Sequence, residues 1–249
     1  MMTLSDEYAV RTEKLRKVFR EKTAVDGIDL EIRAGELFAL LGVNGAGKTT
    51  TIRMLSGLIS PTSGSAFIFG HSVTEDIKSV KPLINVSPQE TAVAENLTVR
   101  ENLKMIAAIY GAAASEAGRK ADEIIGRLKL GDYSSTAAKK LSGGWKRRLS
   151  IAMALISSPK LLFLDEPTLG LDVLARRELW KLIESLKGTI TVILTTHYLE
   201  EAEALSDRIG VMANGRLMKC GTADELKADA GCATLEEAFV RIAGGEIDA

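Results

Sequence analysis

The chain has 249 residues, of which 46% are hydrophobic and 26% are charged, a composition typical of a globular protein with enough apolar residues for a core. A formal net charge of −1 excludes an overall basic field, so no nucleic-acid partner is expected. Two cysteines and two histidines exclude a disulfide framework and a Cys/His zinc cluster. The short basic groups at residues 139–140 and 146–148 are expected to be solvated surface.

No apolar run approaches the roughly 18 residues that span a bilayer. The first residues, MMTLSDEYAVRTEKLRK, carry acidic groups and lack the apolar segment of a signal peptide. The cysteine content fits a reducing cytosol. We therefore expect a cytoplasmic protein that acts at a membrane only through a partner.

The first elements in chain order are predicted strands. Residues 8–15 and 24–36 alternate apolar and polar side chains, which predicts two half-buried strands and a turn at residues 34–35. The continuous apolar run LFALL, residues 37–41, is typical of a strand buried on both faces. A glycine-rich loop and a helix through Leu58 are expected next.

A turn and another strand are predicted over residues 61–70, before the character of the sequence changes. Residues 91–158 have helical patterns, with a capping box at Thr98 and Glu101 and a second helix over residues 115–130. Such a block, placed between strand–helix alternations, predicts an α/β fold with a parallel-sheet core and an inserted helical subdomain.

The last third returns to alternating strands and helices. The predicted elements are a strand over 161–165, a helix over 172–188, a strand over 189–196 and a helix over 198–206. Asn214 and Gly215, between two apolar segments, predict a hairpin. Two short helices are expected to begin at Thr222 and Thr234, each with a glutamate three residues on.

The loop GVNGAGKTT, residues 42–50, matches G-x-x-x-x-G-K-[ST] between a strand and a helix, which is the context that the motif requires. Its glycines allow backbone N–H groups to wrap a phosphate. Lys48 would reach the β- and γ-phosphates, and the Thr49 hydroxyl would bind Mg²⁺. A flexible turn with an exposed lysine is the alternative, which the flanking strand and helix disfavour.

The run LLFLDEP ends a predicted strand with two carboxylates. Asp165 would lie beside the Mg²⁺ of a phosphate loop, and Glu166 could polarise a water for attack on the γ-phosphate. Capping of the next turn, which Pro167 fits, is the alternative. Before this run in the sequence, LSGGW begins a predicted helix over residues 141–155. The free N–H groups at the start of that helix can bind an anion.

The order of the phosphate loop, LSGGW, LLFLDEP and His197 resembles the ATP-binding-cassette ATPases over essentially the whole chain. LSGG is the specific element, because a phosphate loop alone leaves kinases and GTPases open. The resemblance implies a P-loop NTPase (RecA-like) core with an N-terminal antiparallel β subdomain. It implies one nucleotide-binding domain, residues 1–249, divided into a core (1–89 and 160–221), a helical subdomain (90–159) and C-terminal helices (222–249).

The family also implies a site for ATP and Mg²⁺ that two subunits complete. The residues expected to bind nucleotide are Phe19, Gly42, Asn44, Gly45, Ala46, Gly47, Lys48, Thr49, Thr50, Ser142, Gly143, Gly144 and Asp172. Those expected to bind Mg²⁺ are Thr49, Gln89 and Asp165, and those expected in catalysis are Glu166, His197 and Gln89. Ser142 and Gly144 would bind the ATP that the other subunit's phosphate loop holds.

Several of these positions have alternatives or depart from the family. Phe19, expected to stack on adenine, could be a β-sheet residue, and Asp172 could be a plain helix N-cap. Trp145 replaces the usual glutamine after LSGG, and Leu169 replaces a small polar residue. Trp180 is expected to pack rather than to take part in chemistry.

The segment from LTTHYLEEAEALSDR to TLEEAFVRIAG resembles ATPase subunits of ABC-2-type exporters. The resemblance implies pairing with a second cassette, identical or paralogous. It also implies docking of an integral membrane permease on residues 90–140, at the inner face of the membrane. A soluble ABC ATPase of an assembly machine is the alternative, and the Glu166 carboxylate disfavours a non-hydrolytic sensor.

Overall fold

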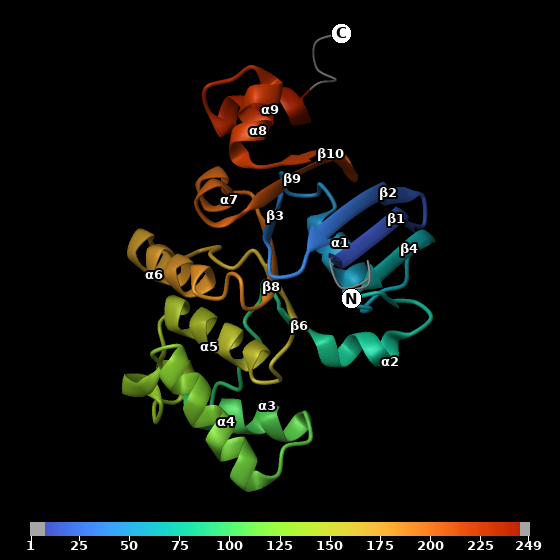
Figure 1. The fold of residues 1–249 in the computed structure, drawn as a ribbon. Helices are drawn as coiled ribbons and strands as arrows, with labels where there is room; N and C mark the ends of the chain where they lie inside the picture. Colours follow the sequence, from blue (N-terminus) through green and yellow to red (C-terminus); the bar gives the residue numbers. More distant parts are fainter. Residues whose placement is uncertain (1–7, 245–249) are drawn as a thin grey trace.

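The computed structural model describes residues 8–244, so the two ends of the predicted domain, 1–7 and 245–249, lie outside the described residues. Figure 1 shows a six-stranded sheet in the middle of the molecule, with helices α3 and α4 toward one end and α8 and α9 toward the other. A second, antiparallel sheet lies to one side. No helix within residues 8–244 has both the length and the apolar content needed to cross a bilayer.

The antiparallel sheet has the order β2-β1-β4-β5. Its strands are β1 (Tyr8–Phe19), β2 (Lys22–Arg33), β4 (Ser63–Ile68) and β5 (His71–Ser72). The hairpin of β1 and β2 is longer than predicted, because register shifts after Thr12 and Leu15 interrupt the alternation from which the strands were inferred. Lys14, between these positions, has a φ of 47°.

The six-stranded sheet has the order β10-β9-β3-β8-β7-β6. Its strands are β3 (Leu37–Leu41), β6 (Ile84–Ser87), β7 (Leu161–Asp165), β8 (Thr191–Thr196), β9 (Arg208–Ala213) and β10 (Arg216–Gly221). All neighbouring pairs are parallel except β9 and β10, which form the predicted hairpin through Asn214 and Gly215. The carboxyl ends of the parallel strands therefore meet at one edge, where ligands bind in open α/β sheets.

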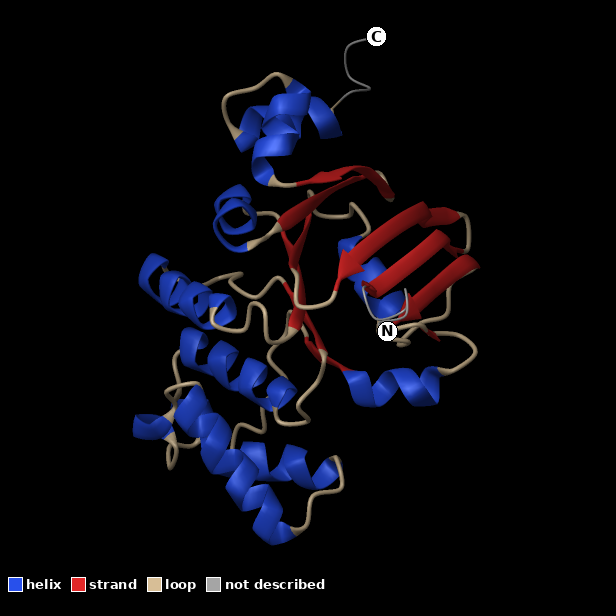
Figure 2. Ribbon diagram, viewed as in Figure 1, coloured by secondary structure: helices blue, strands red, loops and turns tan. Residues whose placement is uncertain are grey.

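The predicted helices occur in the predicted order, and α2 (Ile77–Val80) is an additional helix that was not predicted (Figure 2). The helices are α1 (Lys48–Leu55), α2, α3 (Val99–Ile109), α4 (Ala114–Arg127), α5 (Gly143–Leu155), α6 (Val173–Glu184), α7 (Leu199–Leu205), α8 (Ala223–Ala230) and α9 (Leu235–Ala243), with short 3₁₀ turns at Lys81–Leu83, Gly131–Tyr133 and Ala138–Lys140. Capping boxes begin α3, α8 and α9 as predicted. The first helix of the helical block starts at Val99, directly after the predicted cap Thr98, and the preceding residues of the block form a loop.

Strand β3 separates two apolar cores. Its side chains at Leu37, Ala39 and Leu41 join a cluster with α3 to α6, whereas Phe38 and Leu40 join a cluster with the antiparallel sheet and α1. Every residue of β3 is buried, as expected of a strand covered on both faces. The core thus fixes the loop after β3 between two packed layers.

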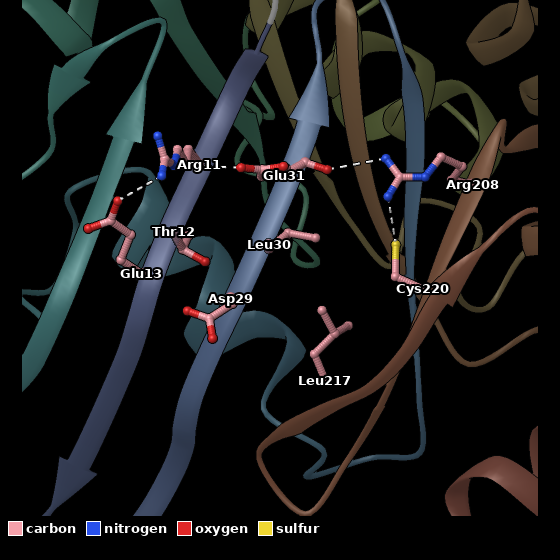
Figure 3. A pocket seen from close by; sticks show the side chains of 9 residues that line it. All are labelled: Arg11, Thr12, Glu13, Asp29, Leu30, Glu31, Arg208, Leu217 and Cys220. Carbon is pink, nitrogen blue, oxygen red and sulfur yellow. Dashed lines mark hydrogen bonds and ion pairs between the residues drawn. The ribbon is translucent and has the colours of Figure 1, made fainter.

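Arg208 of β9 contacts the antiparallel sheet through β2. It also lines a cleft of about 400 Å³ between the two sheets (Figure 3). Its Nη1 donates to the Glu31 carbonyl on β2 at 3.2 Å and to Glu36 Oε1 at 3.2 Å, and its Nη2 lies 3.1 Å from Cys220 Sγ on β10. Burial raises the pKa of the Cys220 thiol, so this cysteine is protonated at neutral pH. A protonated, buried thiol is a poor nucleophile, which favours a structural role for Cys220.

Candidate nucleotide site

The loop between β3 and α1 needs glycine at two positions for steric reasons. A Cβ on Gly42 would lie 2.5 Å from the Met212 carbonyl oxygen, and one on Gly47 would lie 2.6 Å from the Ala24 carbonyl oxygen. Gly47 also has a φ of 103°, which L side chains rarely adopt. The loop therefore packs directly against the backbone of two neighbouring strands, and α1 begins immediately after it.

Lys48 is the first residue of α1, and its ammonium group is held across the loop. Nζ donates to the Gly42 carbonyl at 2.6 Å and to the Val43 carbonyl at 3.3 Å, and it lies 3.2 Å from Glu166 Oε1. The side chains of Lys48 and Glu166 are 6% and 7% exposed. A buried cation in a loop rich in free N–H groups is suited to a phosphate.

Asp165 is the last residue of β7, and its buried carboxylate accepts hydrogen bonds from two threonine hydroxyls. Its Oδ1 accepts hydrogen bonds from Thr49 Oγ1 at 3.1 Å and from Thr195 Oγ1 at 2.6 Å. Within residues 8–244, no group of three or more His, Cys, Asp or Glu side chains could hold a metal ion by itself. A hydroxyl and one carboxylate fit a hard cation that takes its other ligands from phosphate and water.

Glu166 has a left-handed backbone, with a φ of 47°, that is fixed by strand β8. Its N–H donates to both Thr195 Oγ1 at 3.0 Å and the Thr195 carbonyl at 3.2 Å. Its carboxylate lies between two partners, because Oε2 is 2.8 Å from His197 Nδ1 while Oε1 faces Lys48. Thr195 was not predicted as a site residue, although the polar pair TT at the end of an apolar strand is a visible signal.

Lys48, Thr49, Glu166 and His197 line one cavity of about 530 Å³, which lies within the usual range for a small-molecule site. Asp165 is not part of the lining itself and contacts it through Thr49. The predicted residues that line it are Phe19, Asn44, Gly45, Ala46, Gly47, Lys48, Thr49, Thr50, Gln89, Glu166 and His197. Lys22, Ala24 and Leu169 also line it. Gly42 packs against Met212 and does not line the cavity, and neither do Ser142, Gly143, Gly144 and Asp172.

Comparison with known proteins agrees with this geometry. The family model described as ABC transporter matches residues 25–169. The chain belongs to the ABC transporter family. It is 46% identical to the daunorubicin/doxorubicin resistance ATP-binding protein DrrA of Streptomyces peucetius, over 90% of this chain and 68% of that protein. It is 43% identical to the daunorubicin resistance ATP-binding protein DrrA3 of Streptomyces coeruleorubidus, over 90% and 71% of the two chains.

Solved structures of ABC subunits share the fold. An ATP-binding subunit of an ABC transporter superposes with a TM-score of 0.82 at 29% identity, over 94% of this chain and 99% of that one. The cbiO1 protein of Clostridium perfringens has a TM-score of 0.82 at 27% identity, over 97% of both chains. The predicted P-loop NTPase fold is therefore confirmed, and the chain is an ATP-binding and ATP-hydrolysing subunit of an ABC transporter.

The LSGG segment of this ABC subunit is presented at the surface. Ser142 is the N-cap of α5, and both it and Gly143 are exposed. A separate cleft of about 330 Å³ is lined by Ser142, Gly144 and Trp145 among others. The Trp145 indole packs against Tyr133, with ring centroids 4.3 Å apart. The segment therefore does not contribute to the cavity of its own phosphate loop.

Two further predicted positions have defined structural contacts in the ABC subunit. Asp172 caps α6, since its Oδ1 accepts from the Ala175 N–H at 2.9 Å. Trp180 is partly buried and packs against the apolar core, as predicted, and its Nε1 donates to Glu201 Oε1 at 3.0 Å. The capping alternative for Asp172 is thus present in the structure.

Proposed function

We propose that this ABC subunit powers an exporter: two cassettes close on two Mg-ATP molecules and drive a separate permease at the inner face of the membrane. The observation that carries the proposal is the separation of two half-sites. Lys48, Glu166 and His197 share one cavity, whereas the LSGG segment faces outward from another part of the chain. A second cassette would bring the two together.

The proposed chemistry follows from the contacts in the cavity. The N–H groups of the loop and the Lys48 ammonium hold the β- and γ-phosphates, and Mg²⁺ would be held by Thr49, Gln89 and Asp165 and would neutralise developing charge on the phosphates. Glu166 accepts a proton from the water that attacks the γ-phosphorus, and the bond to the β,γ-bridging oxygen breaks. His197 holds the Glu166 carboxylate in place at 2.8 Å.

Adenine recognition is assigned to Phe19. It is the last residue of β1, it lines the cavity, and it is 47% exposed. Lys17 Nζ lies 5.1 Å from the ring centroid, over one face of the aromatic ring. An exposed aromatic side chain next to a phosphate loop can stack on a base. Such stacking contributes about 1–3 kcal/mol to the binding free energy.

The second half-site consists of Ser142, Gly143 and Gly144 at the start of α5, which would face the γ-phosphate of ATP held by the other cassette. A helix N-terminus with an exposed glycine, here Gly143, permits the close approach of an anion. Asp172, whose cap position places it at the surface, would cross the same interface. Closure in this way is a population shift, because ATP contacts both cassettes only in the closed state.

The permease is proposed to dock on the helical subdomain, residues 90–159. The rest of the proposed domain consists of a core, residues 1–89 and 160–221, and the C-terminal helices. Ile109 and Tyr110, at the end of α3, are 71% and 52% exposed. Exposed apolar side chains of this size mark contact sites when they are adjacent. The named resistance proteins that the chain resembles favour an exporter.

Co-purification tests the proposal. The tagged chain is recovered from gently solubilised membranes and its partners are identified. A multi-span membrane protein in stoichiometric amount would support the proposal, and Ile109→Asp should release it. Val240→Asp, which changes another exposed apolar side chain on α9, should retain it. Recovery of soluble partners alone would contradict the proposal and favour a cytosolic assembly machine.

A further inference from the structure

Arg147 is buried, although the basic group at residues 146–148 was expected to be solvated surface. It is 5% exposed, and of the lysines and arginines in residues 8–244 only Lys48 is buried to the same degree. The expectation was wrong for this residue because of helical spacing. Arg147, Ser150 and Ile151 fall on the inner face of α5, and all three are buried.

The Arg147 guanidinium donates hydrogen bonds to two successive carbonyl groups of the loop after β6. Its Nη1 donates to the Pro88 carbonyl at 2.7 Å, and its Nη2 donates to the Gln89 carbonyl at 2.5 Å. Charge-assisted hydrogen bonds of this kind are about twice as strong as neutral ones. The loop that carries Gln89 into the ATP cavity is therefore tied to α5 through its backbone.

A second contact repeats this connection one turn along the helix. Ser150 Oγ and Ser87 Oγ are 3.0 Å apart, and both residues are buried. Ser87 is the last residue of β6, directly before the loop. Helix α5 and the Gln89 loop are thus joined at two points, of which only the contact of Arg147 involves a charge.

Placing a guanidinium here has an energetic cost. Burial lowers the pKa of Arg147, while the nearby Asp165 and Glu201 carboxylates oppose this change. A neutral side chain of similar volume could fill the space without desolvating a charge. The two contacts explain why a cation of this shape is present, because a planar guanidinium group can donate to both carbonyl oxygens at once.

We infer that Arg147 is a positioning residue that fixes the backbone of Gln89 relative to the LSGG end of its own helix. The inference rests on the proposed function. Gln89 lines the ATP cavity, and Ser142 caps the helix that carries Arg147. One helix therefore sets both the backbone position of Gln89 in its own cavity and the position of the segment that would face the second cassette.

The test compares Arg147→Met, Arg147→Lys and the control Lys146→Met in the full chain with its permease. Lys146 is the neighbouring cation on α5 and pairs with Glu95 at the surface. At saturating ATP, kcat should fall about tenfold or more in Arg147→Met, which corresponds to about 1.4 kcal/mol. The Kd for ATP should stay within about twofold, and hydrogen exchange around residue 89 should accelerate.

Arg147→Lys should show an intermediate kcat, because an ammonium group can reach one carbonyl but cannot bridge two in a fixed plane. Full activity in Arg147→Met or in Arg147→Lys would overturn the inference. Parallel loss of ATP affinity, kcat and thermal stability would also overturn it, since that pattern indicates a general role in folding. A wild-type chain that hydrolyses no ATP would contradict the proposed function instead.

Discussion

Glu166 Oε1 lies 3.2 Å from Lys48 Nζ, and the two side chains are almost fully buried together. The Lys48 ammonium has three N–H groups, and it directs them to the Gly42 and Val43 carbonyls and to Glu166. A phosphate that binds Lys48 must replace one of these acceptors. Replacement of Glu166 would free a carboxylate oxygen to accept a proton, which links phosphate binding to activation of the base.

Lys48→Met should abolish most ATP binding. The change removes the cation that faces the phosphates while the apolar stem still fills the space. Loss of a charged hydrogen-bonding partner predicts a decrease in affinity of about tenfold to a hundredfold, measured by calorimetric titration. Lys14→Met, at an exposed lysine on β1, is the matched control, and an unchanged Kd in Lys48→Met would contradict the assignment.

His197→Ala should slow hydrolysis and leave ATP binding nearly intact. The imidazole contacts Glu166 through Nδ1, so its removal leaves the carboxylate free to adopt unproductive positions. A decrease in kcat of about a hundredfold is expected, with a Kd for ATP within about threefold. The only other histidine, His71, pairs with Asp76 away from the cavity, and His71→Ala should match wild type. Equal losses in both variants would contradict the role of His197.

Gly47→Ala should disrupt the phosphate loop. The added Cβ would approach the Ala24 carbonyl at 2.6 Å in a backbone conformation that alanine avoids, so a cost of about 1–3 kcal/mol and weaker ATP binding are expected. Gly126→Ala is the matched control, because Gly126 lies inside α4 with open space around it. That change should stabilise the chain by about 0.5–1 kcal/mol in urea unfolding. A tolerated Gly47→Ala would contradict the packing of the loop.

Glu201→Gln should increase stability in a pH-dependent way. Burial raises the pKa of Glu201, and the nearby Glu166 charge adds to this effect. Above the ordinary pKa near 4.5 the unfolded chain releases this proton first, so the folded wild type binds more protons and loses stability as pH rises. The advantage of Glu201→Gln should therefore grow from pH 4.5 upward to about 1 kcal/mol in urea unfolding. A pH-independent difference would contradict the buried-charge account.

The sequence predicted the parts of the site that depend on local backbone. Residues 42–50 combine the glycines that the loop geometry needs with the strand and helix on either side, and the structure has all three. Strand β7 places Asp165 at its carboxyl end for the same local reason. The register of neighbouring strands then brings Asp165 opposite Thr195.

Contacts between distant segments could not be predicted in this way. The approach of His197 to Glu166 depends on a left-handed backbone at a non-glycine residue, for which the sequence has no signal. Arg147 is indistinguishable in sequence from Lys146 and Arg148 until the path of residues 88–89 is known. The first strand was predicted to end at residue 15 instead of 19, and the second to begin at residue 24 instead of 22, because the irregular register near their turn breaks the apolar alternation.

The most direct test of the account is the mass of the Glu166→Gln variant, measured by light scattering with and without Mg-ATP. The substitution removes the proton acceptor but keeps the shape of the side chain, so ATP should bind without turnover and hold two cassettes closed. We expect a dimer with Mg-ATP, a monomer without nucleotide and a hydrolysis rate at least about a hundredfold below wild type. A variant that stays monomeric with Mg-ATP and still hydrolyses it would contradict the account.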